Sequence, residues 1–440
     1  MELGSVEPGG RKGVALHTKI LIGLVLGAIF GLLAKKLVLD GVLAESKLAT
    51  AIDWASAAGE IFLNLIFMVV VPLLFSALVL GVSELGDVRK IGRIGVRSLV
   101  MTVILSSIAA LIGVGAINLV DPSKSISAEK KLELTQQYNN ELKSTPDPVQ
   151  EKDKAALGLV PKNPLRDAIA AFSGGILPFM VFCLIFGIAV ASVEAEKTLP
   201  LKGVLEGLFA VSLKVIDFAM KFAPIGVFGL VFAAGAKLGI ELFITLGGYV
   251  LVVLVALAVH QFVTYSLVIK YVAKRNPLEF FRQMRTVMAT AFATSSSNAT
   301  LPTAIKAAEE DLGIPRRIGN FVLTVGATAN QNGTALFEGI TIIFLCRIFG
   351  VDLSIGQQFL VMGLAIVGGI GTAGVPSGSL PMIAGVVASL GGPAGAVGLI
   401  VGIDRIMDMS RTVLNVTGDM TIAACVQAME KEGDLEPVPA

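Results

Sequence analysis

Long apolar runs, separated by short polar or basic stretches, set the pattern of this chain. Eight of them are long enough to cross the ~30 Å hydrocarbon core of a bilayer as helices. They lie near Ile20–Ala34, Ile61–Val82, Leu99–Val120, Ile176–Val193, Leu208–Ala234, Leu242–Val268, Ile318–Ile348 and Ala396–Gln427. Because lipid offers the backbone no hydrogen bonds, we predict an all-α polytopic membrane protein with eight transmembrane helices. The first run follows a basic start and has no small-residue cleavage site, which favours a membrane helix over a removable signal peptide.

Two further apolar segments, Thr286–Ala307 and Phe359–Leu390, are interrupted at their centres. The centre of the first, Thr294–Asn298, is small and polar, and that of the second, Gly374–Ser379, is rich in Gly, Pro and Ser. A straight membrane helix does not tolerate such a centre, whereas a re-entrant hairpin uses it as its tip. Two such segments in corresponding halves of a chain are typical of inverted repeats whose half-helices build a substrate site.

Basic residues predict which side of the membrane each loop faces, because cytoplasmic loops are enriched in Lys and Arg. With both termini in the cytoplasm and both hairpins returning to their own side, the basic residues beside the predicted helices fall inside, and Lys35 and Lys36 are minor exceptions. Those on the inside are Arg11, Lys12, Arg89, Lys90, Arg93, Arg97, Lys270, Lys274, Arg275, Arg282, Arg285, Arg316 and Arg317. We expect a multi-pass protein of the inner (plasma) membrane, with the polar stretch Asp121–Asp167 as a long external loop.

Composition supports the membrane assignment and narrows the function. Of the 440 residues, 54% are hydrophobic and 16% are charged, whereas about a quarter of the residues in soluble domains are charged. A net charge of +1 gives no excess of basic groups for binding nucleic acid, so no such partner is expected. The cysteines Cys183, Cys346 and Cys425 lie in apolar stretches without metal-site or CxxC spacing, which favours buried hydrophobic roles. No nucleophile–His–acid set is recognisable, so we expect no enzyme and no bound cofactor.

The last apolar run carries the most informative polar residues. Asp404, Asp408, Arg411, Asn415 and Asp419 recur at spacings of four, three, four and four, which predicts one face of a helix. A charge at membrane depth costs about 2.5 kcal/mol or more and needs a partner or a water-filled cavity. Arg411 can bind a carboxylate through two parallel hydrogen bonds and Asp408 can hold an ammonium, which together suit an acidic amino acid. The alternative is an ion-pair ladder within the helix, although its excess of carboxylates favours a bound cation.

The seventh run contains Gly326–Thr334, a glycine- and amide-rich stretch that should interrupt the helix. Freed backbone carbonyls at such a break are good ligands for a small cation. Glu338 follows one turn after Thr334 among apolar neighbours, where desolvation favours the protonated acid. Glu338 is therefore a candidate proton carrier, and the alternative is a neutral, hydrogen-bonded structural role.

At this point the residues resemble the glutamate/aspartate transporter family, the dicarboxylate/amino acid:cation symporters, including bacterial proton/glutamate-aspartate symporters. The matching runs are Thr294–Pro302, Gly326–Thr334, Gly371–Pro376 and Asp404–Asp419. The resemblance covers nearly the whole chain and is densest from about Phe280 onward. Paired hairpins are a known feature of this family, so the hairpin prediction and the resemblance are not independent.

The resemblance implies a homotrimer that works by an elevator movement, with the hairpin around Gly374–Ser379 as a gate. It divides the chain into a scaffold, which stays in place, and a transport domain, which moves. The expected parts are scaffold helices 1 and 2 in residues 1–98, transport-domain helix 3 in 99–120, the external loop in 121–167, scaffold helices 4 and 5 in 168–240, the rest of the transport domain in 241–430 and a cytoplasmic tail in 431–440.

The resemblance also implies roles for individual positions. Arg411 would bind the substrate's side-chain carboxylate and Asp408 its amine, and the site would be completed by Thr334, Asn415, Ser297 and the backbone at Val375. Asp419 and the carbonyls of Gly326, Asn330 and Asn415 resemble one sodium site. Thr412 and the carbonyls of Gly369, Ile370 and Thr372 resemble a second sodium site or further substrate contacts.

The chain departs from the family pattern at positions that bear on coupling. Asn332 stands where sodium-coupled members carry the aspartate of a third sodium site, and the aligned residues Thr102, Leu105 and Ser106 leave that site degraded. Glu338 matches the glutamate that resembles the proton carrier of animal excitatory amino acid transporters. Ser295 and Met409 occupy the two positions where relatives place an auxiliary arginine, for which Arg405 is a candidate unless it pairs with Asp408.

We therefore expect acidic amino acids to travel most readily with protons, and sodium coupling through Asp419 is the alternative. One pH unit supplies about 1.36 kcal/mol per proton, and each extra positive charge adds roughly 2.3 kcal/mol per 100 mV. A C4-dicarboxylate carrier is a second alternative, although its substrates lack the amine that Asp408 suits. An ion channel would explain polar hairpins but would not require the Arg411–Asp408 pair.

Overall fold

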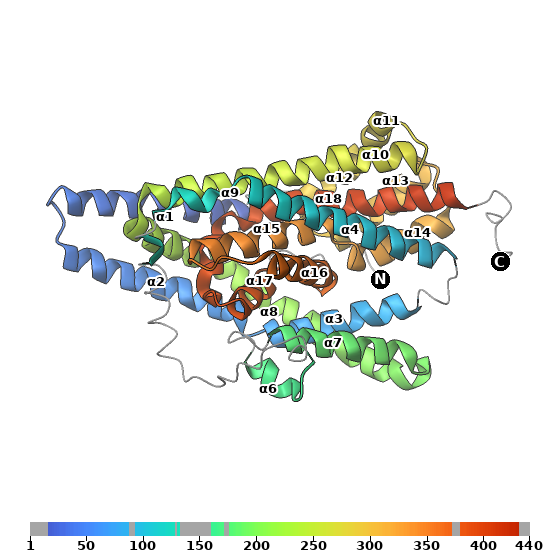
Figure 1. Ribbon diagram of the computed structural model, residues 1–440, viewed down its shortest axis with the longest axis horizontal. Coiled ribbons are helices and arrows are strands. Elements are labelled where there is room, and N and C mark those ends of the chain that lie inside the picture. Colours follow the sequence, from blue (N-terminus) through green and yellow to red (C-terminus); the bar gives the residue numbers. More distant parts are fainter. Residues whose placement is uncertain are drawn as a thin grey trace, which may run out of the picture.

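The computed structural model describes residues 16–87, 93–127, 130–132, 160–170, 176–371 and 379–430. Within these ranges the regular structure is helical and contains no strand, which confirms the all-α prediction. The helices run mostly along the long axis of the molecule, as in a membrane-spanning bundle (Figure 1). Arg11, Lys12, Arg89, Lys90, most of the predicted external loop and the tail 431–440 lie outside the described residues.

One set of helices comes from the first half of the chain, and its members pack mainly on one another. It consists of α1 (Leu16–Leu39), α2 (Glu45–Phe67), α3 (Val70–Asp87), α7 (Ile176–Ser192) and α8 (Ala195–Leu238), with α1 and α2 against α8 and α3 against α7. The short helix α6 (Pro164–Ile169) lies beside α7.

The second set surrounds the buried polar residues. It comprises α4 (Arg93–Leu119), α9 (Ile240–Val259), the π-helical turn η5 (His260–Thr264), α10 (Tyr265–Tyr271), α11 (Pro277–Gln283), α12 (Arg285–Thr294), α13 (Ser297–Glu310), α14 (Arg316–Ala329), α15 (Asn332–Ile348), α16 (Ile355–Gly371), α17 (Leu380–Ser389) and α18 (Val401–Met429). The 3-10 turns η2 (Pro122–Ser125) and η6 (Ala394–Leu399) lie beside α9 and α17, respectively. In Figure 1, α15, α16 and α17 fill the middle of the bundle.

Small residues bring α1 directly against α8. Gly23, Gly27 and Gly31 are spaced by four and face the backbone of α8, where a β-carbon on Gly27 would lie 2.7 Å from the Phe228 carbonyl oxygen. Such close approach lets helices in lipid gain van der Waals contact where the hydrophobic effect contributes little. The glycine spacing in α1 thus explains why this long contact forms.

Among the described residues, five helical stretches are long and apolar enough to cross a membrane by length and composition: Thr18–Leu39, Glu45–Ser83, Arg93–Ser125, Ala195–Leu238 and Ile240–Tyr271. They overlap the predicted runs 1, 2, 3, 5 and 6. The predicted run Ile176–Val193 forms the 17-residue helix α7. The run Ile318–Ile348 is broken into α14 and α15, and Ala396–Gln427 becomes the η6 turn followed by the charged helix α18.

The two interrupted segments fold as pairs of short helices. The arms α12 and α13 have 10 and 14 residues, or about 15 and 21 Å at 1.5 Å per residue. Neither arm spans a ~30 Å core, and the two pack on each other. Ser295 joins them in a left-handed conformation (φ 52°), and the Ser296 hydroxyl caps α13 by accepting a hydrogen bond from the Ala299 amide. In the second segment α16 and α17 have 17 and 10 residues, and residues 372–378 between them lie outside the described residues.

Candidate functional site

The face of α18 that carries the charges is buried in the protein. Arg411 is 2% exposed and donates two hydrogen bonds to Asp408 Oδ1, from Nε at 3.0 Å and from Nη2 at 2.7 Å. Its Nη1 lies 3.5 Å from Asp404 Oδ1, and its guanidinium carbon lies 4.4 Å from the centre of the Phe337 ring. Two carboxylates and an aromatic face therefore hold this cation in a fixed direction.

Arg405, the candidate auxiliary arginine, pairs with Asp408. Its Nη1 lies 3.7 Å from Asp408 Oδ2, three residues further along the same helix. The formal charges of Asp404, Arg405, Asp408 and Arg411 therefore cancel within one cluster. The carboxylate in excess on this face is Asp419, eight residues beyond Arg411 and therefore about 12 Å further along α18.

The predicted break in the seventh run occurs at Asn330 and Gln331, between α14 and α15. Asn415 of α18 fills this break. Its Oδ1 accepts a hydrogen bond from the Gly333 amide at 2.7 Å, and its Nδ2 donates to Gln331 Oε1 and, at 3.2 Å, to Thr334 Oγ1. The side chain of Asn415 thus caps the first turn of α15 and holds Thr334 beside the helix that carries Arg411.

The close approach of α15 to α18 depends on Gly333. A β-carbon on Gly333 would lie 2.6 Å from the Arg411 carbonyl oxygen and 3.0 Å from its Cα. Any side chain at position 333 would therefore push α15 away from α18. The close packing of α15 on α18 brings Thr334 beside Arg411, Asp408 and Asn415. Sequence spacing alone had placed only the three residues of α18 on one face.

The remaining predicted substrate residues are placed as follows. Ser297 lies in the first turn of α13, is 2% exposed, and its hydroxyl has no hydrogen-bond partner among the described residues. Thr412 is 4% exposed and donates to the Asp408 carbonyl at 2.8 Å, within its own helix. Gly369 of α16 packs against Gln331, so the second hairpin touches the helix break. Val375 and Thr372 lie outside the described residues.

Glu338 is fully buried between α15 and the second hairpin. Neither carboxylate oxygen has a hydrogen-bond partner among the described residues. A β-carbon on Gly368 of α16 would lie 3.1 Å from Glu338 Oε2 and would collide with Met382 of α17. Both arms of the hairpin therefore cover this carboxyl group with backbone and apolar atoms, which accommodate a neutral acid far more easily than an unpaired charge.

Asp419 lies apart from this cluster. It is 3% exposed, accepts a hydrogen bond from Asn330 Nδ2 at 2.7 Å, and its carboxylate packs directly on Gly326. Asn330 Oδ1 is buried without a donor among the described residues. Asp419, Gly326 and Asn330, three residues of the predicted sodium site, thus lie together, and the Gly326 carbonyl accepts a hydrogen bond from the Asn330 backbone amide at 2.8 Å. No cluster of three or more His, Cys, Asp or Glu side chains occurs in the described ranges.

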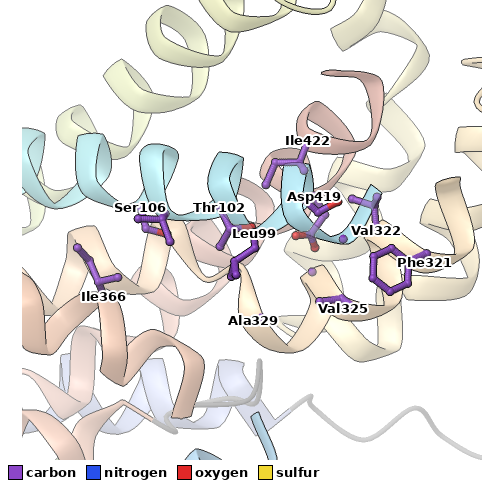
Figure 2. A pocket seen from close by; sticks show the side chains of 14 residues that line it. Leu99, Thr102, Ser106, Phe321, Val322, Val325, Ala329, Ile366, Asp419 and Ile422 are labelled. Carbon is purple, nitrogen blue, oxygen red and sulfur yellow. The ribbon is translucent and has the colours of Figure 1, made fainter. Parts of the chain in front are cut away.

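Asp419 lines a cavity between α4, α14, α16 and α18. In Figure 2, Asp419 reaches from α18 toward the space between α4 and α14, beside Leu99 and Val322. Ser98, Thr102 and Ser106 line the same cavity at a spacing of four along α4. The cavity walls are otherwise mostly apolar.

Neutral partners surround Asn332. Its Oδ1 accepts a hydrogen bond from Ser106 Oγ at 2.6 Å, and its Nδ2 donates to the Tyr265 hydroxyl at 2.9 Å. The Tyr265 hydroxyl in turn donates to the Leu414 carbonyl at 3.1 Å. An uncharged amide with both ends hydrogen-bonded gives a cation no compensating charge here, in keeping with the expected loss of a third sodium site.

The chain is similar to known proteins along nearly its whole length. The family model described as "Sodium:dicarboxylate symporter family" matches residues 16–429. The chain belongs to this family. It is 31% identical over 432 residues to the proton/sodium-glutamate symport protein of Bacillus subtilis, which covers 98% of this chain and 96% of the relative. It is 29% identical to the proton/glutamate-aspartate symporter of Escherichia coli (96% and 94% covered) and 30% identical to human excitatory amino acid transporter 3 (94% and 86%).

Sequence reasoning missed two polar residues of this sodium:dicarboxylate symporter family member. Gln331 bonds Asn415, and Tyr265 bonds Asn332. A signal for Gln331 was present, since it lies within the amide-rich stretch Gly326–Thr334 that was predicted to interrupt the helix. Tyr265 gave no such signal, because the π-helical turn η5 that precedes it and sets its direction leaves no clear mark in the sequence.

Proposed function

We propose that this chain is a secondary active symporter of acidic amino acids, L-glutamate or L-aspartate, coupled mainly to protons. The observation that carries the proposal is Arg411, a guanidinium buried at 2% exposure and aimed at Asp408 by two hydrogen bonds. The substrate carboxylate replaces Asp408 on the guanidinium, and the released Asp408 binds the substrate amine. A C4-dicarboxylate has no amine for Asp408, which is why it is the weaker candidate.

Charge balance explains why a cation must accompany the substrate. The cluster of Asp404, Arg405, Asp408 and Arg411 is neutral, whereas glutamate or aspartate brings one net negative charge into a buried site. An uncompensated buried charge costs several kcal/mol. At least one proton or metal cation therefore has to enter with each substrate molecule.

Glu338 is the proposed proton carrier. It is fully buried beneath both arms of the second hairpin, and its oxygens have no hydrogen-bond donor among the described residues. Closing the hairpin over an ionised Glu338 would leave a carboxylate without a hydrogen-bond donor, whereas the protonated acid fits. Proton binding would in this way be linked to closure of the gate.

Sodium is the second candidate ion, favoured by the buried carboxylate of Asp419 beside Gly326 and Asn330. Asn330 Oδ1 faces no donor among the described residues, and Asp419 has no cationic partner there. A sodium ion between these groups would supply the missing positive charge. The names of the Bacillus relatives include both ions.

The proposed architecture has eight transmembrane helices and two hairpins in inverted repeats, and works as an elevator in a homotrimer. Residues 1–98 and 168–240 form the scaffold, and 99–120 and 241–430 form the transport domain. The packing of α1, α2, α3, α7 and α8 mainly on one another, and of α4 with α9 to α18, supports this division. The proposed orientation places both termini in the cytoplasm of a plasma-membrane protein.

Labelled glutamate and aspartate uptake into proteoliposomes tests the function. The pH and sodium gradients are imposed separately, with the membrane potential clamped. We expect uptake with an inward proton gradient in the absence of sodium. Uptake that requires sodium would replace the proton with the second ion, and uptake of succinate but of neither amino acid would overturn the substrate assignment.

A further inference from the structure

Asp408 lies between two arginines of its own helix, α18. Its Oδ1 accepts both hydrogen bonds from Arg411, three residues further along the chain. Its Oδ2 faces Arg405, three residues earlier, whose Nη1 lies 3.7 Å away. Residues three apart are neighbours on a helix surface, so the two arginines reach one carboxylate from opposite directions along the helix. The proposed function assigns Arg411 and Asp408 to the substrate and leaves Arg405 without a role.

The contact between Arg405 and Asp408 is an ion pair without a hydrogen bond. Its length of 3.7 Å is about 1 Å longer than a charge-assisted hydrogen bond. Asp408 Oδ2, an acceptor, and Arg405 Nε, a donor, are both buried and have no hydrogen-bond partner among the described residues. Buried polar atoms in folded proteins are nearly always paired. Two unpaired atoms on adjacent side chains therefore indicate a contact that is completed in another state of the site.

A second half-buried arginine, Arg347, shows how a structural ion pair is built in this protein. Arg347 pairs with Asp121 at 3.5 Å, and its side chain is 15% exposed, close to the 17% of Arg405. It also donates hydrogen bonds to the Ile117 carbonyl, at 2.8 Å, and to Asn118 Oδ1. Arg347 thus ties the end of α15 to the end of α4, whereas Arg405 makes no hydrogen bond to any of the described residues.

Substrate binding changes the surroundings of Asp408. In the proposed exchange the substrate carboxylate takes the two hydrogen bonds of Arg411, and Asp408 loses its closest cation. The Asp408 side chain is 4% exposed, and a carboxylate this deeply buried is strongly destabilised without a positive partner. Arg405 is already within ion-pair distance and has no other acid to pair with in the described part of the chain. It can therefore compensate the charge of Asp408 throughout the exchange.

Arg405 can also fix the direction of this carboxylate. A carboxylate that is held at neither oxygen turns freely about its last bond, whereas one held at Oδ2 presents Oδ1 in a defined direction. Oδ1 is the oxygen that Arg411 releases. A closing movement of about 1 Å brings Arg405 to hydrogen-bond distance of Oδ2. Oδ1 then stays directed toward Arg411 and hence toward the substrate bound there.

We propose that Arg405 is a positioning residue that holds Asp408 by Oδ2 while the substrate occupies Arg411, so that Oδ1 binds the substrate amine. This inference rests on the proposed function and adds a determinant of specificity to it. Arg405 thereby sets the preference of the site for acidic amino acids over dicarboxylates that lack an amine.

The test measures binding to the purified full-length protein, by competition of L-aspartate and of succinate with labelled glutamate. Succinate carries the two carboxylates of aspartate but no amine. We expect Arg405→Gln to weaken aspartate binding about tenfold, as the loss of one hydrogen bond to a charged group does, and to leave succinate binding nearly unchanged. The ratio of the succinate to the aspartate inhibition constant should fall by the same factor. Arg405→Lys, which keeps the charge but not the planar fork, should recover part of this ratio.

Two other roles of Arg405 predict different ratios. If Arg405 only attracts anions, its loss weakens succinate more than aspartate, because succinate carries one more net negative charge, and the ratio rises. If Arg405 only stabilises the fold, both inhibition constants change in equal proportion. A ratio that rises or keeps its wild-type value in Arg405→Gln therefore overturns the proposal.

Arg347→Gln is the matched control. It removes a half-buried arginine from an ion pair of similar length that lies outside the substrate site. This variant should lower the thermal stability of the protein and leave the ratio of inhibition constants unchanged. An equal fall of the ratio in Arg347→Gln would overturn the specific role of Arg405.

A structure of the aspartate-bound protein supplies a second measurement that needs no variant. We expect Arg405 within hydrogen-bond distance of Asp408 Oδ2, and the substrate amine on Oδ1. An Arg405 side chain turned away from Asp408 would overturn the proposal. Aspartate bound without contact to Arg411 would instead overturn the proposed function, and so would a wild-type protein that binds succinate as tightly as aspartate.

Discussion

Replacing Arg411 with alanine tests the centre of the proposed site. The change removes two hydrogen bonds to Asp408, at 3.0 and 2.7 Å, and the ion pair to Asp404 at 3.5 Å. Removing one partner of a buried ion pair costs about 3–5 kcal/mol. Without the guanidinium, a substrate carboxylate loses a comparable free energy of binding. At 1.36 kcal/mol per tenfold, this loss corresponds to about 10²- to 10⁴-fold weaker binding.

Instability has to be separated from lost recognition, because Arg411→Ala leaves the cluster with one excess negative charge. The double variant Arg411→Ala/Asp404→Ala removes one charge of each sign and restores the balance. We expect its thermal unfolding to recover toward wild type while glutamate binding stays at least about 10²-fold weakened. Arg411→Lys keeps the charge but not the planar fork, so it should bind with intermediate affinity.

The assay is equilibrium binding of labelled glutamate and aspartate to purified protein, with thermal unfolding of each variant measured in parallel. Proteoliposome uptake of the same substrates provides the functional readout. A folded double variant that binds glutamate within about tenfold of wild type would refute the reasoning. Arg411 would then be a structural partner of its neighbouring aspartates.

Three further outcomes are expected. Glu338→Gln, a neutral replacement of similar shape, should flatten the dependence of uptake on external pH, and an unchanged pH profile would move the proton to another group. Withdrawal of sodium should leave substantial glutamate uptake, and a complete loss of uptake without sodium would contradict proton coupling. The variant Asp419→Asn should remove any stimulation of uptake by sodium. In Gly368→Ala the added methyl group collides with Met382, so the variant should weaken substrate binding by about 1–3 kcal/mol through the second hairpin. The control is Gly363→Ala on the same helix, whose methyl group meets no atom within 4 Å. An equal effect of the control on substrate binding would refute the steric explanation.

Local sequence patterns were sufficient to predict the helical membrane architecture, the two interrupted segments and the spacing of the charges on α18. These features follow from local rules: hydrophobic length, the intolerance of a membrane helix for Gly, Pro and polar centres, and the periodicity of 3.6 residues per turn. Departures such as Asn332 and Glu338 could also be identified, because the surrounding motif fixes their position along the chain.

The contacts between side chains on different helices could not be predicted in this way, because they depend on how the helices pack. Sequence spacing allowed Arg411 to reach Asp404, Asp408 or a partner on another helix, and packing selected both aspartates and the Phe337 ring. The partnership of Gln331 with Asn415 joins residues 84 positions apart. Such contacts depend on the separation of helices and the direction of each side chain, which the packing of the whole bundle sets and no local pattern encodes.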